Sequence, residues 1–417
     1  MDKRMGFALV ELLVIVIVIS ILGIAGVLGF GTQSSQVATP SAKNPQVERV
    51  GNISDTVTLE PRENIIKDKI VFTRLNGNII LYDINTQKEI QLTSYNGVMD
   101  AMYNQSGTTD VTYPQSFVFS PTLINTQEVG FGKCDVFDNG TKDKNGVRLY
   151  SECGIFKIDL KTKKVSKVLV LKKGVGLNNV VWFDDQTYAY ITTTPNWKLF
   201  YVNGNTEVKL QEEEYKAYGD EYGVYSNLSF SRNGSYLLQA SPSFPRSDKD
   251  FKVYAYDLST YKETIVENAI MAEWLDKDTF VFNKYPTSTE GLWRYDMITG
   301  ESTQLPETIE NDHQPIPRRG QNVFMYDHYD SGTGGLRVYD GENGKLSKFS
   351  FGCSYYGWVN PETIICKGLN ESPIFNVTSG EQKGSIYAFD FNNFVTEYNG
   401  SYAKYETFIY PLGIGTF

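Results

Sequence analysis

The sequence predicts an all-β protein built from seven repeated units and preceded by a single N-terminal transmembrane α-helix. Three observations carry this prediction: an uncharged apolar run near the N-terminus, two strand motifs that recur through the remainder, and a composition rich in Gly, Asn, Thr and Tyr. Thr and Tyr favour strands, whereas Gly and Asn favour turns. Long helix-favouring stretches are scarce in the same part of the chain.

The composition also excludes several function classes. The net charge of −10 argues against a nucleic-acid partner, which needs a basic surface to bind phosphates. Only two histidines occur in 417 residues, so a multi-histidine metal enzyme is not expected. Hydrophobic residues at 41% and charged residues at 21% are typical of a folded chain rather than a disordered one.

The N-terminal apolar run is long enough to cross a membrane. Residues 12–30 carry no charge, and a helix of that length spans about 29 Å, close to the hydrocarbon core of a bilayer. Lys3 and Arg4 precede the run, so the positive-inside bias keeps the N-terminus cytoplasmic and exports the remainder. The run is too long for a cleaved secretory signal, and an uncleaved signal anchor is the plain alternative.

The order of residues around this run carries more information than its length. Residues 3–13 read KRMGFALVELL, which resembles the class III signal of type IV prepilins and pseudopilins. The resemblance implies that a prepilin peptidase cuts after Gly6, that the new N-terminal Phe7 is methylated, and that Glu11 sets the register of subunit assembly. A carboxylate within a membrane is costly unless it is paired. The alternative for Glu11 is a place at headgroup level, near the N-terminus of the helix.

The resemblance covers only about the first thirty residues, so it addresses anchoring rather than the rest of the chain. Residues 32–55 are polar, contain two prolines and lack a helical apolar period, which is typical of a linker. The predicted organisation is therefore a leader over 1–6, a transmembrane helix over 7–30, a linker over 31–64 and a β domain over 65–417.

Two strand motifs recur in the β domain. The first is a strand that ends in Tyr-Asp or a similar pair and is followed by a turn and another strand; it occurs at 80–83, 156–159, 199–203, 253–257, 292–296, 336–340 and 386–390. The second is a strand that ends in an aromatic residue and a turn; it occurs at 117–121, 181–185, 228–234, 273–278 and 357–361. Asp, Asn and Gly at the strand ends suit tight reversals.

The spacing of these motifs predicts a β-propeller. Four strands in a unit of about 40 to 55 residues is the signature of a propeller blade. Seven blades are predicted, with six or eight as alternatives, whereas a pair of β-sandwiches would show shorter spacing. The pattern resembles propellers of the TolB-like and dipeptidyl-peptidase types. The first unit lacks the aromatic-ending strand, and residues 405–410 are a spare β run that could complete it.

The four cysteines predict two local disulfides. Cys134 and Cys153 fall on runs expected to be neighbouring strands, and Cys353 and Cys366 flank a turn in the last unit. These pairings are favoured among three connectivities, and disulfides fit an exported domain. A zinc site is the alternative, but no C-x-x-C spacing supports it.

Two segments are candidate binding sites. From Thr141 the chain reads T-x-D-x-N-G-x5-E, an EF-hand-like pattern that would place Asp143, Asn145 and Glu152 on a Ca²⁺ ion. Because flanking helices are not evident, a polar hairpin loop is favoured there, and no cofactor is expected otherwise. The acidic segment 212–225 carries four tyrosines that could bind a ligand or pack between blades: Tyr215, Tyr218, Tyr222 and Tyr225.

The sequence shows no catalytic constellation, so an enzyme is not predicted. The G-x-S-x-G, H-E-x-x-H and P-loop patterns are missing, and His313 and His328 of the sixth unit have no evident partner. The expected protein is a pilin-like, membrane-inserted chain that displays a propeller for adhesion, as a minor or tip subunit of a pilus or pseudopilus. The alternative is a membrane-anchored propeller enzyme or scaffold that uses the pilin-like start for export.

This expectation also predicts the binding partners of the protein and its location in the cell. The partners would be a prepilin peptidase, other pilin-like subunits, the membrane and an unknown surface ligand. The anchor would lie in the cytoplasmic (inner) membrane with the head outside, or at the cell surface or in a pilus after assembly.

Overall fold

A computed structural model describes the chain from Asp68 to Tyr387 with gaps. The gaps are 75–76, 96–115, 137–149, 193–196, 214–226, 241–250, 285–290, 306–307, 309–311, 319–322, 331–332, 341–344, 350–353, 361, 368–370 and 378. The prepilin-like motif, the predicted helix 7–30, the linker and the run 405–410 lie outside the described residues. No helix within the described part of the chain is long and apolar enough to span a bilayer.

The described residues form seven antiparallel sheets, in each of which the strands follow one another in chain order. The first sheet has three strands, β1 (Lys69–Thr73), β2 (Ile79–Asp83) and β3 (Lys88–Gln91). The second has β4 (Ser116–Leu123), β5 (Glu128–Val136), β6 (Tyr150–Asp159) and β7 (Val165–Val170). The third has β8 (Leu177–Trp182), β9 (Thr187–Thr192), β10 (Trp197–Asn203) and β11 (Thr206–Glu213).

The other four sheets have four strands each. The fourth has β12 (Asn227–Phe230), β13 (Tyr236–Ala240), β14 (Lys252–Asp257) and β15 (Lys262–Glu267). The fifth has β16 (Ala269–Trp274), β17 (Thr279–Lys284), β18 (Leu292–Asp296) and β19 (Ser302–Gln304). The sixth has β20 (Asp312–Arg318), β21 (Val323–Asp330), β22 (Thr333–Asp340) and β23 (Lys345–Phe349). The seventh has β24 (Ser354–Asn360), β25 (Thr363–Lys367), β26 (Glu371–Asn376) and β27 (Gln382–Tyr387).

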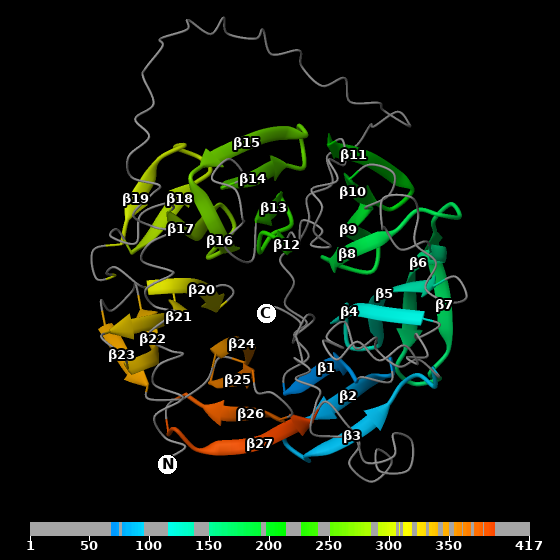
Figure 1. Cartoon of the computed structure of the whole chain (residues 1–417), viewed down its shortest axis with the longest axis horizontal. Helices are drawn as coiled ribbons and strands as arrows, with labels where there is room; N and C mark the ends of the chain where they lie inside the picture. The colour runs from blue at the N-terminus through cyan, green and yellow to red at the C-terminus, as the bar shows by residue number, and fades with distance from the viewer. Residues whose placement is uncertain are drawn as a thin grey trace, which may run out of the picture. The chain divides into compact units, whose positions relative to one another are not determined.

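These sheets are the blades of a seven-bladed β-propeller, as the repeats predict. Figure 1 shows them arranged in a ring, with β4, β8, β12, β20 and β24 towards the centre and β3, β7, β15, β23 and β27 at the rim. Blades 1 to 7 are numbered here in chain order. Residues alternate between the two faces of each strand, so every blade presents one apolar face to each neighbour.

Each pair of neighbouring blades shares a buried hydrophobic cluster. The ring closes through the cluster of blades 7 and 1, in which Ile70 and Phe72 of β1 meet Val359 and Ile365. Polar contacts reinforce this closure, since the Asn360 side chain donates a hydrogen bond to the Asp68 carboxylate. The stability of the ring therefore depends on burial between blades, at roughly 25 cal/mol for each Å² of apolar surface removed from water.

The Tyr-Asp motif forms the same turn in several blades. In blade 2 the Asp159 carboxylate accepts hydrogen bonds from the backbone N–H of Thr162, at 2.6 Å, and from its hydroxyl, at 2.8 Å. The backbone N–H of Thr162 is the largest cause of the lowered pKa of Asp159. Four residues after the acidic or amide residue, five blades have a left-handed residue: Gln87, Lys163, Tyr261, Gly300 and Gly380. This turn marks the third strand of a blade.

The turn also identifies the strand that blade 1 lacks among the described residues. Asp83 at the end of β2 binds the backbone N–H of Thr86 at 2.9 Å, in the same way that Asp159 ends β6. β2 is therefore a third strand, β1 a second strand and β3 a fourth strand. The strand without a described counterpart is the innermost one, as expected from the missing aromatic-ending motif. Whether residues 405–410 supply it stays a prediction.

In blade 7 the predicted Tyr-Asp motif lies on a different strand from the one expected. Residues 386–390 were expected to repeat the Tyr-Asp strand, but Ile386 and Tyr387 end β27, the fourth strand of the blade. The third strand is β26, whose Asn376 takes the place of the aspartate and binds the backbone N–H of Ser379 at 2.8 Å. An amide oxygen can cap this turn as a carboxylate does, so a motif that requires Tyr-Asp does not find the third strand of every blade.

Candidate functional site

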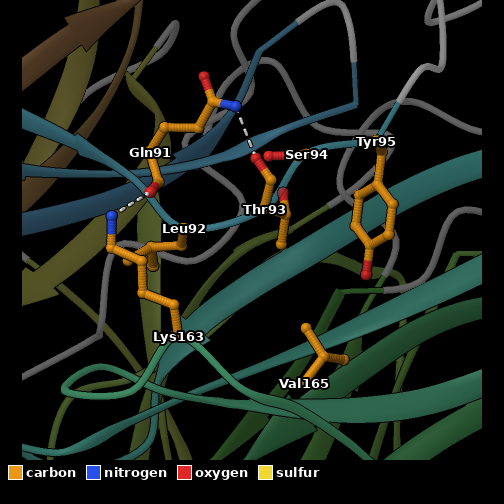
Figure 2. A pocket seen from close by; sticks show the side chains of 7 residues that line it. All are labelled: Gln91, Leu92, Thr93, Ser94, Tyr95, Lys163 and Val165. Atoms are coloured by element: carbon orange, nitrogen blue, oxygen red, sulfur yellow. Dashed lines mark hydrogen bonds between the residues drawn. The ribbon is translucent and has the colours of Figure 1, made fainter.

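Two polar sites are candidates for function, a pocket at the rim and a buried group in blade 6. The pocket lies between the chain leaving β3 and the turn that begins β7, with a volume of about 380 Å³. Figure 2 shows its lining residues: Gln91, Leu92, Thr93, Ser94, Tyr95, Lys163 and Val165. Lys163 reaches across from blade 2 and donates to the main-chain oxygen of Gln91 at 3.1 Å.

The phenol of the pocket has a raised pKa. Burial, and then the negative charge of Asp135, raise the pKa of Tyr95 to about 12. The Lys133 ammonium lies 5.4 Å from the centre of the Tyr95 ring and pairs with Asp135 at 2.7 Å. At physiological pH the pocket therefore offers hydroxyl groups and one ammonium, which suits a small polar ligand rather than acid–base chemistry.

The buried group in blade 6 joins three neighbouring strands. His328 on β21 lies directly opposite Asp312 on β20, and its Nδ1 is 2.5 Å from the Asp312 carboxylate. Its Nε2 is 2.5 Å from the guanidinium of Arg337 on β22. The main-chain oxygen of Asp312 also accepts a hydrogen bond of 2.7 Å from Asn283 of blade 5, so the group is tied to the neighbouring blade.

The chemistry of arginine fixes the protonation of His328. A guanidinium can only donate hydrogen bonds, so Nε2 must accept and cannot carry a proton. The neutral ring then holds its proton on Nδ1 and donates it to Asp312. A buried carboxylate that orients a histidine is part of hydrolytic triads. Here, however, Arg337 occupies the nitrogen that a general base would use, so the group fits a structural role better than a catalytic one.

Arg337→Met is expected to destabilise the protein by about 1–3 kcal/mol, because the buried Nε2 of His328 loses its donor. Urea denaturation would measure this loss. Arg294→Met is the matched control, since Arg294 is an exposed arginine on β18 and its loss should cost little. Long-range ¹H–¹⁵N spectra of labelled histidine should show the Nδ1–H form for His328. A ring protonated on Nε2 in the wild-type protein would contradict this assignment.

Asp327, the residue before His328, faces the other side of the sheet. It pairs in register with Leu336, which belongs to the cluster shared with blade 7. The side chain is only 8% exposed, and burial raises its pKa to about 7. This carboxyl group therefore titrates near neutral pH.

Of the predicted disulfides, the structure contains the one between Cys134 and Cys153. These residues are directly opposite on β5 and β6, and both are buried. Cys366 is also disulfide-bonded, while Cys353, its expected partner, lies outside the described residues. At least one covalent link thus fastens the hairpin that encloses the insertion 137–149.

The other predicted sites lie mostly outside the described residues. This holds for Gly6, Phe7, Glu11, Asp143, Asn145 and the four tyrosines Tyr215, Tyr218, Tyr222 and Tyr225. Glu152, the expected twelfth residue of the Ca²⁺ loop, lies within β6 and pairs with Lys167 at 2.9 Å. Within the described ranges, no three His, Cys, Asp or Glu side chains are grouped to hold a metal. The Ca²⁺ site stays a prediction.

The comparisons with known proteins extend only to the fold. No protein-family model and no curated protein matches the chain. TolB from Acinetobacter baumannii has 14% identity and a TM-score of 0.39, over 75% of this chain and 77% of that one. The propeller domain of the trilobed protease from Pyrococcus furiosus has 12% identity and a TM-score of 0.44, over 78% and 92%.

A third similar structure belongs to a pair of prolyl endopeptidases, with 13% identity and a TM-score of 0.49 over 78% of this chain. The chain spans about half the length of that peptidase, 51%. The described domain is a seven-bladed β-propeller with TolB-like structural neighbours. Because a propeller hosts many unrelated activities, these likenesses assign no substrate.

Proposed function

We propose that the chain is an exported, membrane-inserted, pilin-like protein that displays its β-propeller as a binding head for adhesion. The observation that carries the proposal is the N-terminal order of residues, with Lys3, Arg4 and Gly6 before Phe7 and Glu11 in the fifth place after the expected cut. The uncharged run that follows is long enough to cross a bilayer. This combination fits a prepilin signal better than a plain signal anchor.

The head itself supports export. The disulfide between Cys134 and Cys153 lies in the described propeller, and disulfides persist in oxidising compartments outside the cytosol. The head is also large, and a filament built from this subunit alone would crowd its heads. A minor or tip position in a pilus or pseudopilus is therefore favoured over a major one.

Binding is favoured over catalysis for the head. Among the described residues, the buried Asp312–His328 pair most resembles part of a catalytic site. Arg337, however, occupies the His328 nitrogen that would act as a base. The pocket at the rim, in contrast, is lined by the exposed Ser94 and Lys163 and by the partly buried Tyr95. A small polar group on a surface ligand is the chemistry that this pocket would recognise.

Mass spectrometry of the N-terminus tests the export proposal. We expect the protein purified from cells with prepilin peptidase to begin at a methylated Phe7, and the protein from cells without it to retain Met1. Glu11→Gln should still be cleaved but should fail to co-purify with pilin-like subunits, because the assembly contact is lost. An intact Met1 in the presence of the peptidase would refute the pilin-like reading.

A further inference from the structure

The rim of blade 2 carries an unusual run of lysines and valines. Residues 161–173 read KTKKVSKVLVLKK, with six lysines and no acidic residue, in a protein whose net charge is −10. This run, named here the basic edge, includes the whole of β7 and the residues on either side of it. So dense a positive charge in an acidic protein is suited to an anionic partner.

The basic edge combines charge with exposed apolar side chains. β7 is the outermost strand of its sheet, and its pairing partner is β6 alone. Val165, Val168 and Val170 are 38%, 37% and 44% exposed. They are half of the six large hydrophobic side chains that are exposed in the described part of the protein.

Acidic neighbours do not neutralise the basic edge. Over residues 116–136 and 150–174, the described part of blade 2, eight lysines accompany four aspartates and glutamates. Two of these acids are engaged by lysines of the inner strands, since Lys133 pairs with Asp135 and Lys157 with Glu128. Glu152 pairs with Lys167, an exposed contact that contributes little. The fourth acid, Asp159, lies beside the basic edge and interacts with the charge of Lys161, so the six lysines of the edge face two carboxylates. A positive excess therefore remains on the basic edge.

The backbone of the basic edge is poorly suited to accept another strand. The register with β6 shifts between Ile155 and Phe156, which leaves Val168 as the extra residue of a bulge. Bulges and edge lysines both oppose strand addition. The side chains rather than the main chain are thus left to bind a partner, and an extended peptide is disfavoured.

We propose that the basic edge docks on the anionic lipid headgroups of the membrane in which the chain is anchored. Lysines attract such headgroups, and valines between them can enter the interfacial layer. The inference rests on the proposed function for the anchor, because a flexible linker of 34 residues has a root-mean-square end-to-end distance of roughly 30–35 Å. Tethering raises the effective concentration of the head at the membrane surface, so that even a weak contact is formed for much of the time.

Lysine acylation in nanodiscs tests the proposal. The full chain would be reconstituted in discs of phosphatidylcholine, with or without one-quarter phosphatidylglycerol, and the labelling rate of each lysine would be followed by mass spectrometry. We expect Lys164, Lys167 and Lys172 to react at least fivefold more slowly in the anionic discs. The difference should disappear in 0.5 M salt, because screening weakens the contact. Lys262 and Lys277, exposed in blades 4 and 5, should react equally in both.

A pair of variants sharpens the test. Lys164→Gln/Lys167→Gln should abolish the slow labelling of Lys172, whereas the matched Lys262→Gln/Lys277→Gln should retain it. Equal rates in the two kinds of disc would overturn the proposal while leaving the anchor intact. Slow labelling that requires two heads in a disc, irrespective of lipid charge, would assign the basic edge to a second copy instead. Failure to enter either disc would overturn the anchor and this inference with it.

Discussion

Asp327→Asn is expected to stabilise the protein at pH 8 by about 2 kcal/mol and to remove a loss of stability that the wild type shows between pH 4 and 7. Burial raises the pKa of Asp327 from an ordinary value near 3.8 to about 7. The folded protein therefore holds this proton more tightly than the unfolded chain does. The stabilising contribution is fully present below pH 4 and is lost as the pH rises to about 7.

The difference between the two pKa values sets a ceiling of roughly 4 kcal/mol on the effect. The expected gain is smaller because the asparagine amide must also be accommodated among the side chains shared with blade 7. Urea denaturation at pH 4, 5.5, 7 and 8 would measure the free energy of unfolding of both proteins. Parallel curves for wild type and variant would contradict the prediction.

Asp159→Asn provides a control of opposite sign. The backbone and side-chain hydrogen bonds of Thr162 lower the pKa of Asp159. The contribution of Asp159 to the free energy of unfolding is thus present when the pH is above the ordinary pKa of aspartate, and it is lost as the pH falls. Both substitutions should have smaller effects on stability in acid than at pH 8. At pH 8, however, Asp159→Asn should destabilise the protein, whereas Asp327→Asn should stabilise it.

Cys134→Ala/Cys153→Ala is expected to lower the free energy of unfolding by about 3 kcal/mol. The disulfide closes a loop with a sequence separation of 19, and loss of a cross-link of that length frees the unfolded chain by roughly this amount. Denaturation under non-reducing conditions would measure it. An unchanged midpoint would show that the cross-link does not constrain the unfolded chain.

Reducing agent supplies the comparison for this variant. Dithiothreitol should destabilise the wild type by more than the double substitution does, because Cys366 is disulfide-bonded as well. The double variant should respond to the reductant only through that second bond. A wild-type protein with free thiols after isolation from intact cells would also count against export.

Most of the repeats were predictable because the turn after the third strand and the buried strands of a blade have local sequence patterns. The inner strand of blade 6 was not predicted, since β20 reads DHQPIPR, with two prolines and no aromatic ending. The same strand supplies Asp312, so the buried group around His328 was missed as well. Its members are 16 and 9 residues from His328, and only the hairpin register brings them together. The available signal was His328 itself, one of two histidines in the chain.

The pocket at the rim was also beyond sequence reasoning. Its two sides come from different blades, and Lys163 reaches Gln91 across 72 residues of chain. No local pattern encodes that contact. The order of the blades predicts that the segment after β3 lies near the turn before β7. The residues that line the pocket, however, depend on the path of the chain after β3.

The closure between blades 1 and 7 has a consequence for the order of folding. Neighbouring blades elsewhere join residues about one unit apart, as when Trp274 donates to the Ser229 oxygen 45 residues away. The bond between Asn360 and Asp68 spans 292 residues. Closing the longer loop costs about 1.7 kcal/mol more chain entropy. Six junctions can therefore form progressively along the chain, and the seventh is expected to form last and to open first under load.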